Sequence, residues 1–106
     1  MGSEENQIVE NVDITFFQEI QKGENLCYIL FENEKKTEAT ILEIKEFPAF
    51  HGISRVPFAV MVSVEESTVY PQKIYPVLNL KNQVAEVFLV PVAREKGCLH
   101  YQAVFS

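Results

Sequence analysis

Two residues of the chain could supply a nucleophile and a base, because Cys98 and His100 stand two positions apart in the stretch GCLHY. A thiol acts as a nucleophile when a histidine lies within hydrogen-bond reach and a third group orients that histidine. On a strand, both side chains would point to one face, with Cα atoms roughly 6.5–7 Å apart. The spacing permits contact, but the sequence supplies no third group. We therefore predict that the pair is not catalytic.

Metal and cofactor chemistry has no recognised pattern in this sequence. A metal site needs three or four convergent ligands, and the candidates are His51, His100, two distant cysteines and the pair Glu65 and Glu66. The chain has 4 glycines, too few for an obvious phosphate-binding loop, and it contains neither GxSxG nor HExxH. We expect no metal, no cofactor and no enzymatic activity.

The two cysteines, Cys27 and Cys98, are 71 positions apart, and each lies in an apolar stretch. Free cysteine is among the most buried residue types, so we expect two reduced core thiols, with a disulfide or an exposed thiol as the alternative. The N-terminal stretch MGSEENQIVENVD has no apolar segment of the kind that a signal peptide needs. We therefore expect a cytoplasmic protein.

Binding residues are suggested by the stretch VYPQKIYPV, in which Tyr70 and Tyr75 each precede a proline. Residues before proline avoid the helical region, so both tyrosines are held extended. One interpretation is a rigid start of a strand, with the Gln72 amide bonded to loop backbone. The alternative is a recognition role for Tyr70, Gln72 and Tyr75.

The two longest connections, 49–54 and 65–72, carry the aromatic residues Phe50 and Tyr70. Aromatic side chains on a rigid scaffold are favoured interface anchors. If the two connections converge, we expect Phe50, Tyr70, Gln72 and Tyr75 to form a protein-contact surface. The alternative is that Phe50 and Tyr70 cover the open end of the core.

The elements that must position these residues are mostly strands. Thr15 and Gln18 form a capping-box pattern before a short helix over 16–22, and Gly23 is expected to end it. Apolar alternation with turn residues such as Asn82 and Gly97 predicts six strands, at 26–33, 38–47, 55–66, 73–80, 83–92 and 98–105. This order predicts an all-β fold, a small antiparallel β-barrel or sandwich of about six strands with one short N-terminal helix.

Alternation also predicts which side chains share a face. In each of four strands we expect one set of residues to share a face. The sets are Phe58, Val60, Val62 and Val64 in 55–66; Leu99, Tyr101, Ala103 and Phe105 in 98–105; Thr40, Leu42 and Ile44 in 38–47; and Ile74, Pro76, Leu78 and Leu80 in 73–80. Prolines 57, 71, 76 and 91 lie in or beside these strands. Proline is tolerated at a strand's first residue, on an edge or at a bulge, so we expect a curved sheet with strand breaks and exposed edges.

Length and charge limit the class of protein. The 106 residues suit one domain, which we divide into a flexible acidic arm, 1–12, and a β domain, 13–106. The net charge of −6 is uneven, because residues 1–46 hold 11 acids and 4 bases and the remainder 4 acids and 5 bases. An acidic chain without a basic stripe does not suit nucleic acid. With no apolar run long enough to span a bilayer, we also expect no membrane contact.

Four segments resemble a family of small bacterial domains of uncharacterised function. They are RVPFAVMV, YPQKIYPV, VFLVPV and YQAVFS, at 55–62, 70–77, 87–92 and 101–106. The family's segments read R-x-PF, P-Q-G-x-Y, FLVPV and Y-x-A-x-F-N, and the resemblance runs from about Ile14 to the C-terminus. Lys73 and Ser106 depart from that pattern, which has Gly and Asn there. Some members are encoded near proteins resembling phage tail-collar or tail-fibre components.

The expected function is therefore a non-catalytic structural or protein-interaction module, which the resemblance suggests is an accessory to phage-tail-like proteins. A protein partner or self-association is expected. The alternative is a small-molecule-binding β-barrel, which would need a hollow interior. The inward residues assigned above are mostly Phe, Val, Leu and Ile, which fill the interior of a barrel of this size.

Overall fold

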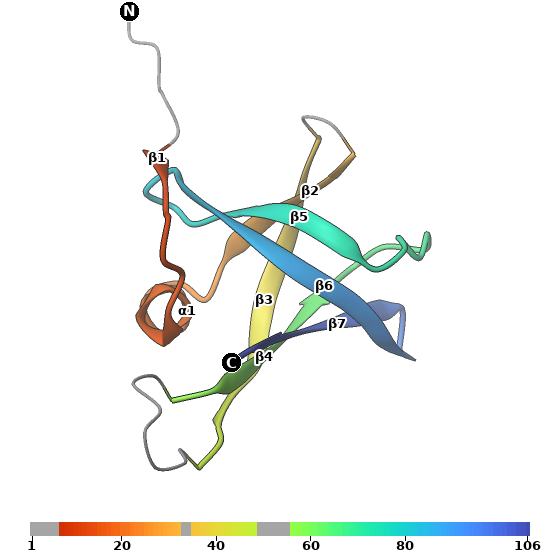
Figure 1. The fold of residues 1–106 in the computed structure, drawn as a ribbon. Helices are drawn as coiled ribbons and strands as arrows, with labels where there is room; N and C mark the ends of the chain where they lie inside the picture. Colours follow the sequence, from red (N-terminus) through yellow and green to blue (C-terminus); the bar gives the residue numbers. More distant parts are fainter. Residues whose placement is uncertain (1–6, 33–34, 49–55) are drawn as a thin grey trace, which may run out of the picture.

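The structure is a computed structural model that describes residues 7–32, 35–48 and 56–106. Within these residues the chain forms one helix and seven strands (Figure 1). They are β1 Gln7–Ile8, α1 Ile14–Lys22, β2 Cys27–Glu32, β3 Lys35–Glu46, β4 Phe58–Val64, β5 Lys73–Leu78, β6 Gln83–Glu95 and β7 Cys98–Phe105.

The strands form two antiparallel meanders that join at both edges. Strands β2, β3 and β4 pair in sequence order, as do β5, β6 and β7. Pairing of β4 with β7 and of β2 with β5 then closes the ring. The all-β prediction with a short helix is confirmed, and the architecture is the barrel rather than the sandwich. Exposed sheet edges were expected at the strand breaks, whereas the described strands close on themselves.

Helix α1 closes one end of the barrel. Its buried residues, Phe16, Phe17 and Ile20, face the core, and the Phe17 ring lies 6.1 Å from Phe58 and 5.5 Å from Phe105. The predicted Thr15 cap is wrong. Asp13 caps the helix instead, because its side chain accepts a hydrogen bond from the Thr15 N–H at 3.0 Å. A carboxylate at this position satisfies an N–H that the helix itself leaves unpaired.

The connection after α1 is fixed by Asn25 rather than by Gly23. Gly23 ends the helix as predicted, with φ −78° and its N–H donating to the Glu19 carbonyl, and Asn25, with φ 53°, turns the chain toward β2. The Asn25 side chain then bonds both backbone groups of Ile41, donating to its C=O at 3.1 Å and accepting from its N–H at 3.0 Å. These two hydrogen bonds attach the end of the helix to the middle of β3.

A bulge in β3 changes which of its side chains face the core. The register with β4 shifts between Ile41 and Glu43, and a bulge re-aims the side chains that follow it. Thr37, Ala39 and Ile41 are buried, whereas Leu42 is 48% exposed. Thr40 and Leu42 therefore share the exposed face, whereas Ile44, predicted on the same face, is half-buried against the core beyond the bulge.

Alternation is confirmed in β4 and β7 and for Tyr75 opposite Ile74 in β5, but the predicted shared face of β5 is wrong at Leu78. Phe58, Val60, Val62 and Val64 are buried, as are Leu99, Tyr101 and Ala103. In β5, however, Tyr75 and Val77 are buried and Ile74 is 56% exposed. Ile74 was expected to share a face with Leu78, which is buried. The wrong assignment of β5 matters below, because it concealed an exposed apolar side chain.

Each proline with a described strand beside it occupies a position that the sheet tolerates. Pro57 precedes β4, and Pro91 stands where the β6–β7 register shifts. Pro76 lies inside β5, next to Val77, where the pairing with β2 ends. Both predicted positive φ angles are present, at Asn82 (63°) and Gly97 (82°). Proline thus interrupts ladders at bulges and strand starts and leaves the ring closed.

The predicted acidic arm, 1–12, is described from residue 7 onward. Gln7 and Ile8 pair in parallel with Gln83 and Val84 of β6, and Val9 and Val12 pack against the core. In the described part of the chain, no helix has the length and apolar character that a membrane crossing requires.

Candidate functional site

Four aromatic rings close the barrel end that lies opposite α1. The Phe31 ring stacks on Tyr70 with centroids 4.5 Å apart, and it contacts Tyr75 at 4.9 Å and Tyr101 at 5.0 Å. Tyr75 and Tyr101 are 3% and 0% exposed, whereas Tyr70 is half-buried. We call these four residues the tyrosine end. Tyr70 therefore covers the open end of the core, as the alternative interpretation of this residue expected.

Hydrogen bonds from the tyrosines hold the connection between β4 and β5. The Tyr70 N–H donates to the Tyr101 hydroxyl at 3.0 Å, and the Tyr75 hydroxyl donates to the Pro71 carbonyl. Burial raises the pKa of Tyr75, and burial followed by the charge of Glu32 raises the pKa of Tyr70. Both hydroxyls therefore stay protonated at neutral pH. This part of VYPQKIYPV is a rigid start to β5.

The predicted contact residues are not gathered on one surface by the described chain. Tyr75 is inside the core, Tyr70 is half-buried and Gln72 is exposed. Phe50 lies outside the described residues. Phe47 and Pro57 are described residues on either side of it, and the Phe47 N–H donates to the Pro57 carbonyl at 2.9 Å. Pro57 directly precedes β4. The 65–72 connection leaves the other end of β4. Of the three that the structure describes, Tyr70 and Gln72 keep access to solvent.

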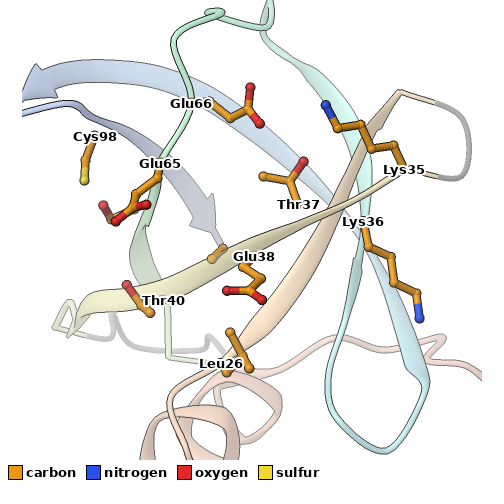
Figure 2. A pocket seen from close by; sticks show the side chains of 11 residues that line it. Leu26, Lys35, Lys36, Thr37, Glu38, Thr40, Glu65, Glu66 and Cys98 are labelled. Atoms are coloured by element: carbon orange, nitrogen blue, oxygen red, sulfur yellow. The ribbon is translucent and has the colours of Figure 1, made fainter.

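A polar groove of about 370 Å³ runs beside β3 (Figure 2). Its charged side chains are Lys35, Lys36, Glu38, Glu65 and Glu66, and Figure 2 shows them spread around the groove rather than directed at one point. Among residues 7–32, 35–48 and 56–106, no three metal-binding side chains converge. The groove therefore presents a mixed-charge surface, without the clustered donors that a metal or acid–base site uses.

The cysteines differ in their surroundings. Cys27 is buried, its thiol donates to the Ala39 carbonyl at 3.7 Å, and burial raises its pKa to about 12. Cys98 is half-buried at the rim of the polar groove, so the expectation of a core thiol is wrong for Cys98. Both are free thiols. Cys98 and His100 share the outer side of β7 without a hydrogen bond between the described side chains.

A second, more apolar groove of about 510 Å³ lies between the end of α1 and the β5–β6 turn. Ile20, Leu26 and the half-exposed Leu80 supply its apolar surface, and Lys22 and Lys81 supply charge. The groove is open to solvent on the outside of the barrel. It provides a shallow apolar surface, with no described cluster of groups that could perform chemistry.

Four of the large apolar side chains left in solvent belong to strands of the second meander. Ile74 of β5 and Phe88 of β6 are direct cross-strand partners, and they are 56% and 50% exposed. Val92 of β6 and Val104 of β7 are 45% and 64% exposed. Their strands lie side by side, with β5 and β6 in the foreground of Figure 1. We call the cross-strand pair Ile74 and Phe88 the outer patch.

The outer surface of β3 before its bulge differs from the outer patch. The outward residues of β3 before its bulge are Lys36, Glu38 and Thr40, all exposed and polar. The sequence of β6 is continuously apolar from Val87 to Val92, and a strand in a small barrel has one face that does not enter the core. Its apolar character on both faces was therefore the signal for an exposed patch, and the sequence interpretation did not use it.

Comparison with known proteins identifies the family of the chain. No curated protein and no solved structure matches it. The sequence model of one family of uncharacterised domains matches residues 21–105, which include every strand of the barrel and leave out most of α1. The chain therefore belongs to the family described as Domain of unknown function (DUF6916).

Proposed function

We propose that this barrel is a non-catalytic protein-interaction module that docks through the outer patch. The observation that carries the proposal is the cross-strand pair Ile74 and Phe88. These two large apolar side chains lie opposite each other and are 56% and 50% exposed. Single exposed apolar residues are ordinary, but adjacent ones on a flat sheet face are typical of interaction sites. Burying them in a partner would remove this apolar surface from water.

The filled interior supports docking over the alternative of a small-molecule-binding barrel. Tyr101, Ile29 and Leu89 are among the largest fully buried side chains, and they come from three different strands of the ring. A barrel of about this size either fills with side chains or holds one small ligand. With bulky residues from opposite strands in the centre, the surface is the part of the molecule available for binding.

The partner is proposed from the family resemblance. Because some similar domains are encoded near phage tail-collar-like proteins, we place this module as a structural accessory to such a protein in the cytoplasm. The two free thiols are consistent with a reducing compartment. A rigid barrel with one apolar face suits an accessory role, because docking would require little rearrangement.

The test is direct binding between the full chain and a tail-collar-like protein encoded beside it. Isothermal titration should give a complex that Phe88→Lys or Ile74→Lys weakens at least about tenfold, as expected for central interface residues. Leu42→Lys is the matched control, because Leu42 is 48% exposed on β3 and the charge change is the same. Undetectable binding by the unmodified chain, or equal weakening by Leu42→Lys, would contradict the proposal.

A further inference from the structure

The edge of β6 that faces away from β5 is only partly paired. The two residues of β1 pair with Gln83 and Val84 at one end of this edge, and β7 pairs with the other end from Val90 onward. Among the described residues, no strand pairs with 85–89 on this side. Although the ring closes where β6 meets β7, the stretch between these two contacts is therefore a short unpaired sheet edge.

Alternation along β6 determines which backbone groups point to this edge. The Val84 carbonyl accepts a hydrogen bond from the Val9 N–H at 2.8 Å, on the β1 side. Backbone groups of successive strand residues point to opposite edges, so those of Glu86 and Phe88 point to the same side as those of Val84. Glu86 lies opposite Pro76 of β5, which has no N–H to donate. In the described part of the chain, neither Glu86 nor Phe88 makes a backbone hydrogen bond outside the strand ladders, so their N–H and C=O groups are left for water or for a partner.

Strands β6 and β7 diverge beside this edge (Figure 1). Their ladder ends at Val90 and Gln102, although β7 continues to Phe105. Phe105 is half-buried, and so is Val9, where the chain leaves β1, and both side chains pack against the core. The unpaired edge therefore lies between elements whose apolar side chains are only partly covered by the described chain.

We propose that an extended segment of another protein adds to the barrel as a strand along β6, at Glu86 and Phe88. The inference goes beyond the proposed function, because the site is the backbone edge of β6, whereas the outer patch consists of side chains on the outer face. Strand β1 already shows this kind of pairing, since it is a short extended segment bound to the same edge. Addition of a strand to an exposed edge is a recurrent mode of peptide recognition, in which backbone hydrogen bonds provide affinity.

The side chains of β6 specify the chemistry of the added segment. Side chains alternate between the two faces of a strand, so one set on the segment would lie outward beside Glu86 and Phe88, and the other set would point toward the core. Glu86 is exposed, so a lysine or arginine beside it would form a favourable cross-strand pair, and an apolar residue suits the position beside Phe88. The occupant is therefore an extended segment with apolar residues at alternate positions and a base among the outward ones.

Hydrogen exchange at single residues of the full chain, measured by NMR, tests whether the edge is unpaired. The amides of Glu86 and Phe88 should exchange at least about tenfold faster than those of Val87 and Leu89, because only the latter must break hydrogen bonds to β5 before they exchange. Equal protection of the two sets would mean that β6 has no donors to offer, and the inference would be wrong.

A short capped peptide in which valine alternates with lysine and threonine is the binding probe. Titrated into the full chain, it should bind saturably and slow the exchange of the Glu86 and Phe88 amides. Methylation of every second peptide nitrogen should weaken binding at least about tenfold for one of the two alternate sets and less than about threefold for the other, because only one set donates to β6. Absence of saturable binding, or equal weakening by both sets, overturns the inference.

Variants of the chain separate this edge from the outer patch. Glu86→Pro removes an N–H that points to the edge and should weaken peptide binding at least about tenfold, whereas Glu86→Gln, the matched control, keeps that N–H and should weaken it less than about threefold. Ile74→Lys changes the outer patch on β5 and should also alter peptide binding less than about threefold. Peptide binding that withstands Glu86→Pro in a chain folded by circular dichroism contradicts the inference. If Glu86→Pro does not fold, the methylated peptides decide alone. Loss of the tail-collar-like partner in Ile74→Lys tests only the proposed function, so the two can fail separately.

Discussion

The two ends of the barrel are closed by aromatic clusters of different chemistry. At the end closed by α1, four phenylalanines meet through ring contacts of 4.6–6.1 Å, namely Phe16, Phe17, Phe58 and Phe105. At the tyrosine end, three tyrosines surround Phe31, and two of them use their hydroxyls to hold backbone groups of the β4–β5 connection. One end is an apolar plug, and the other is a hydrogen-bonded clamp.

The two clusters contribute in different ways. The phenylalanines mainly stabilise the barrel, whereas the tyrosines fix the local geometry of the chain. Apolar contact is non-directional, so the helix end can gain stability from any well-filled arrangement of rings. The tyrosine end fixes where the chain enters β5, because each hydroxyl has one defined backbone partner. The family match covers residues 21–105 and so contains the tyrosine end but not Phe16 or Phe17.

The largest effect is expected when the apolar plug loses a ring. Phe17 is 3% exposed, and replacing a buried phenylalanine by alanine costs about 3–5 kcal/mol, a large part of the 5–15 kcal/mol that stabilises a typical domain. Phe17→Ala should therefore lower the free energy of unfolding by about that amount in urea denaturation. Phe47→Ala, at a half-buried position, is the control and should cost clearly less. A loss below about 1 kcal/mol would mean that α1 does not stabilise the barrel.

Much of the barrel could be predicted from the sequence, because a strand with one buried face alternates between inward and outward residues. Strands β4 and β7 pair along their whole length in one register, so their sequences reveal the core face directly. Strand β3 could not be predicted in the same way. Its bulge follows Ile41, whose backbone bonds the Asn25 side chain 16 residues away, and a local pattern does not contain these bonds. The helix was predicted within two residues, but its cap was assigned to Thr15 instead of Asp13.

The outer patch was missed for a related reason. In β5, apolar residues stand at both inward and outward positions, so alternation alone could not decide which set is buried. The contacts of Tyr75 with Phe31 and of its hydroxyl with Pro71 place Tyr75 inside, and Ile74 is outside as a consequence. These contacts join separate strands and are absent from the local sequence. Tyr70 and Gln72 were identified, but mainly as parts of a rigid connection.

Alkaline pH should act on one end of the barrel and leave the other unchanged. Burial raises the pKa of Tyr70 and Tyr75 above 10.0, their ordinary value, so the folded state binds their protons more tightly than the unfolded state. Their contribution to stability is complete below pH 10 and is lost as pH rises through the folded pKa. Cys27 has the same sign, with loss between its ordinary 9.0 and about 12. The four phenylalanine rings at the other end do not titrate.

The melting temperature should therefore fall as pH rises above 9, with tyrosinate absorbance appearing as the protein unfolds. Tyr75→Phe removes one of the titrating groups, and its melting temperature should fall less steeply over the same range. If Tyr75→Phe and the unmodified chain have identical slopes, ionisation at the tyrosine end does not limit alkaline stability. Phe17→Ala should lower the melting temperature at every pH without changing the slope.

A smaller effect is expected when the clamp loses one acceptor. Tyr101→Phe keeps the ring in the core but leaves the half-buried Tyr70 N–H without its partner at 3.0 Å. An unsatisfied donor of this kind costs about 1–3 kcal/mol, and we expect the lower part of this range because Tyr70 keeps some access to water. Hydrogen exchange should show faster opening of the β4–β5 connection, with little change in α1. Tyr28→Phe, which removes the hydroxyl of a half-buried tyrosine on β2, is the control. Equal exchange in both variants would contradict the clamp.

The smallest effect concerns the start of the helical plug, and it distinguishes the two caps. Asp13 accepts from the Thr15 N–H in the structure, whereas the sequence pattern assigned the cap to Thr15. Replacing a cap residue by alanine costs about 0.5–2 kcal/mol. Asp13→Ala should cost about 1 kcal/mol, and Thr15→Ala, at an exposed position inside the helix, should cost less or be neutral, since alanine favours helix. The midpoints of urea denaturation measure both. If Thr15→Ala costs more stability than Asp13→Ala, then Thr15 and not Asp13 caps the helix. A loss for Asp13→Ala that leaves hydrogen exchange at the tyrosine end unchanged would show that the two ends are stabilised independently.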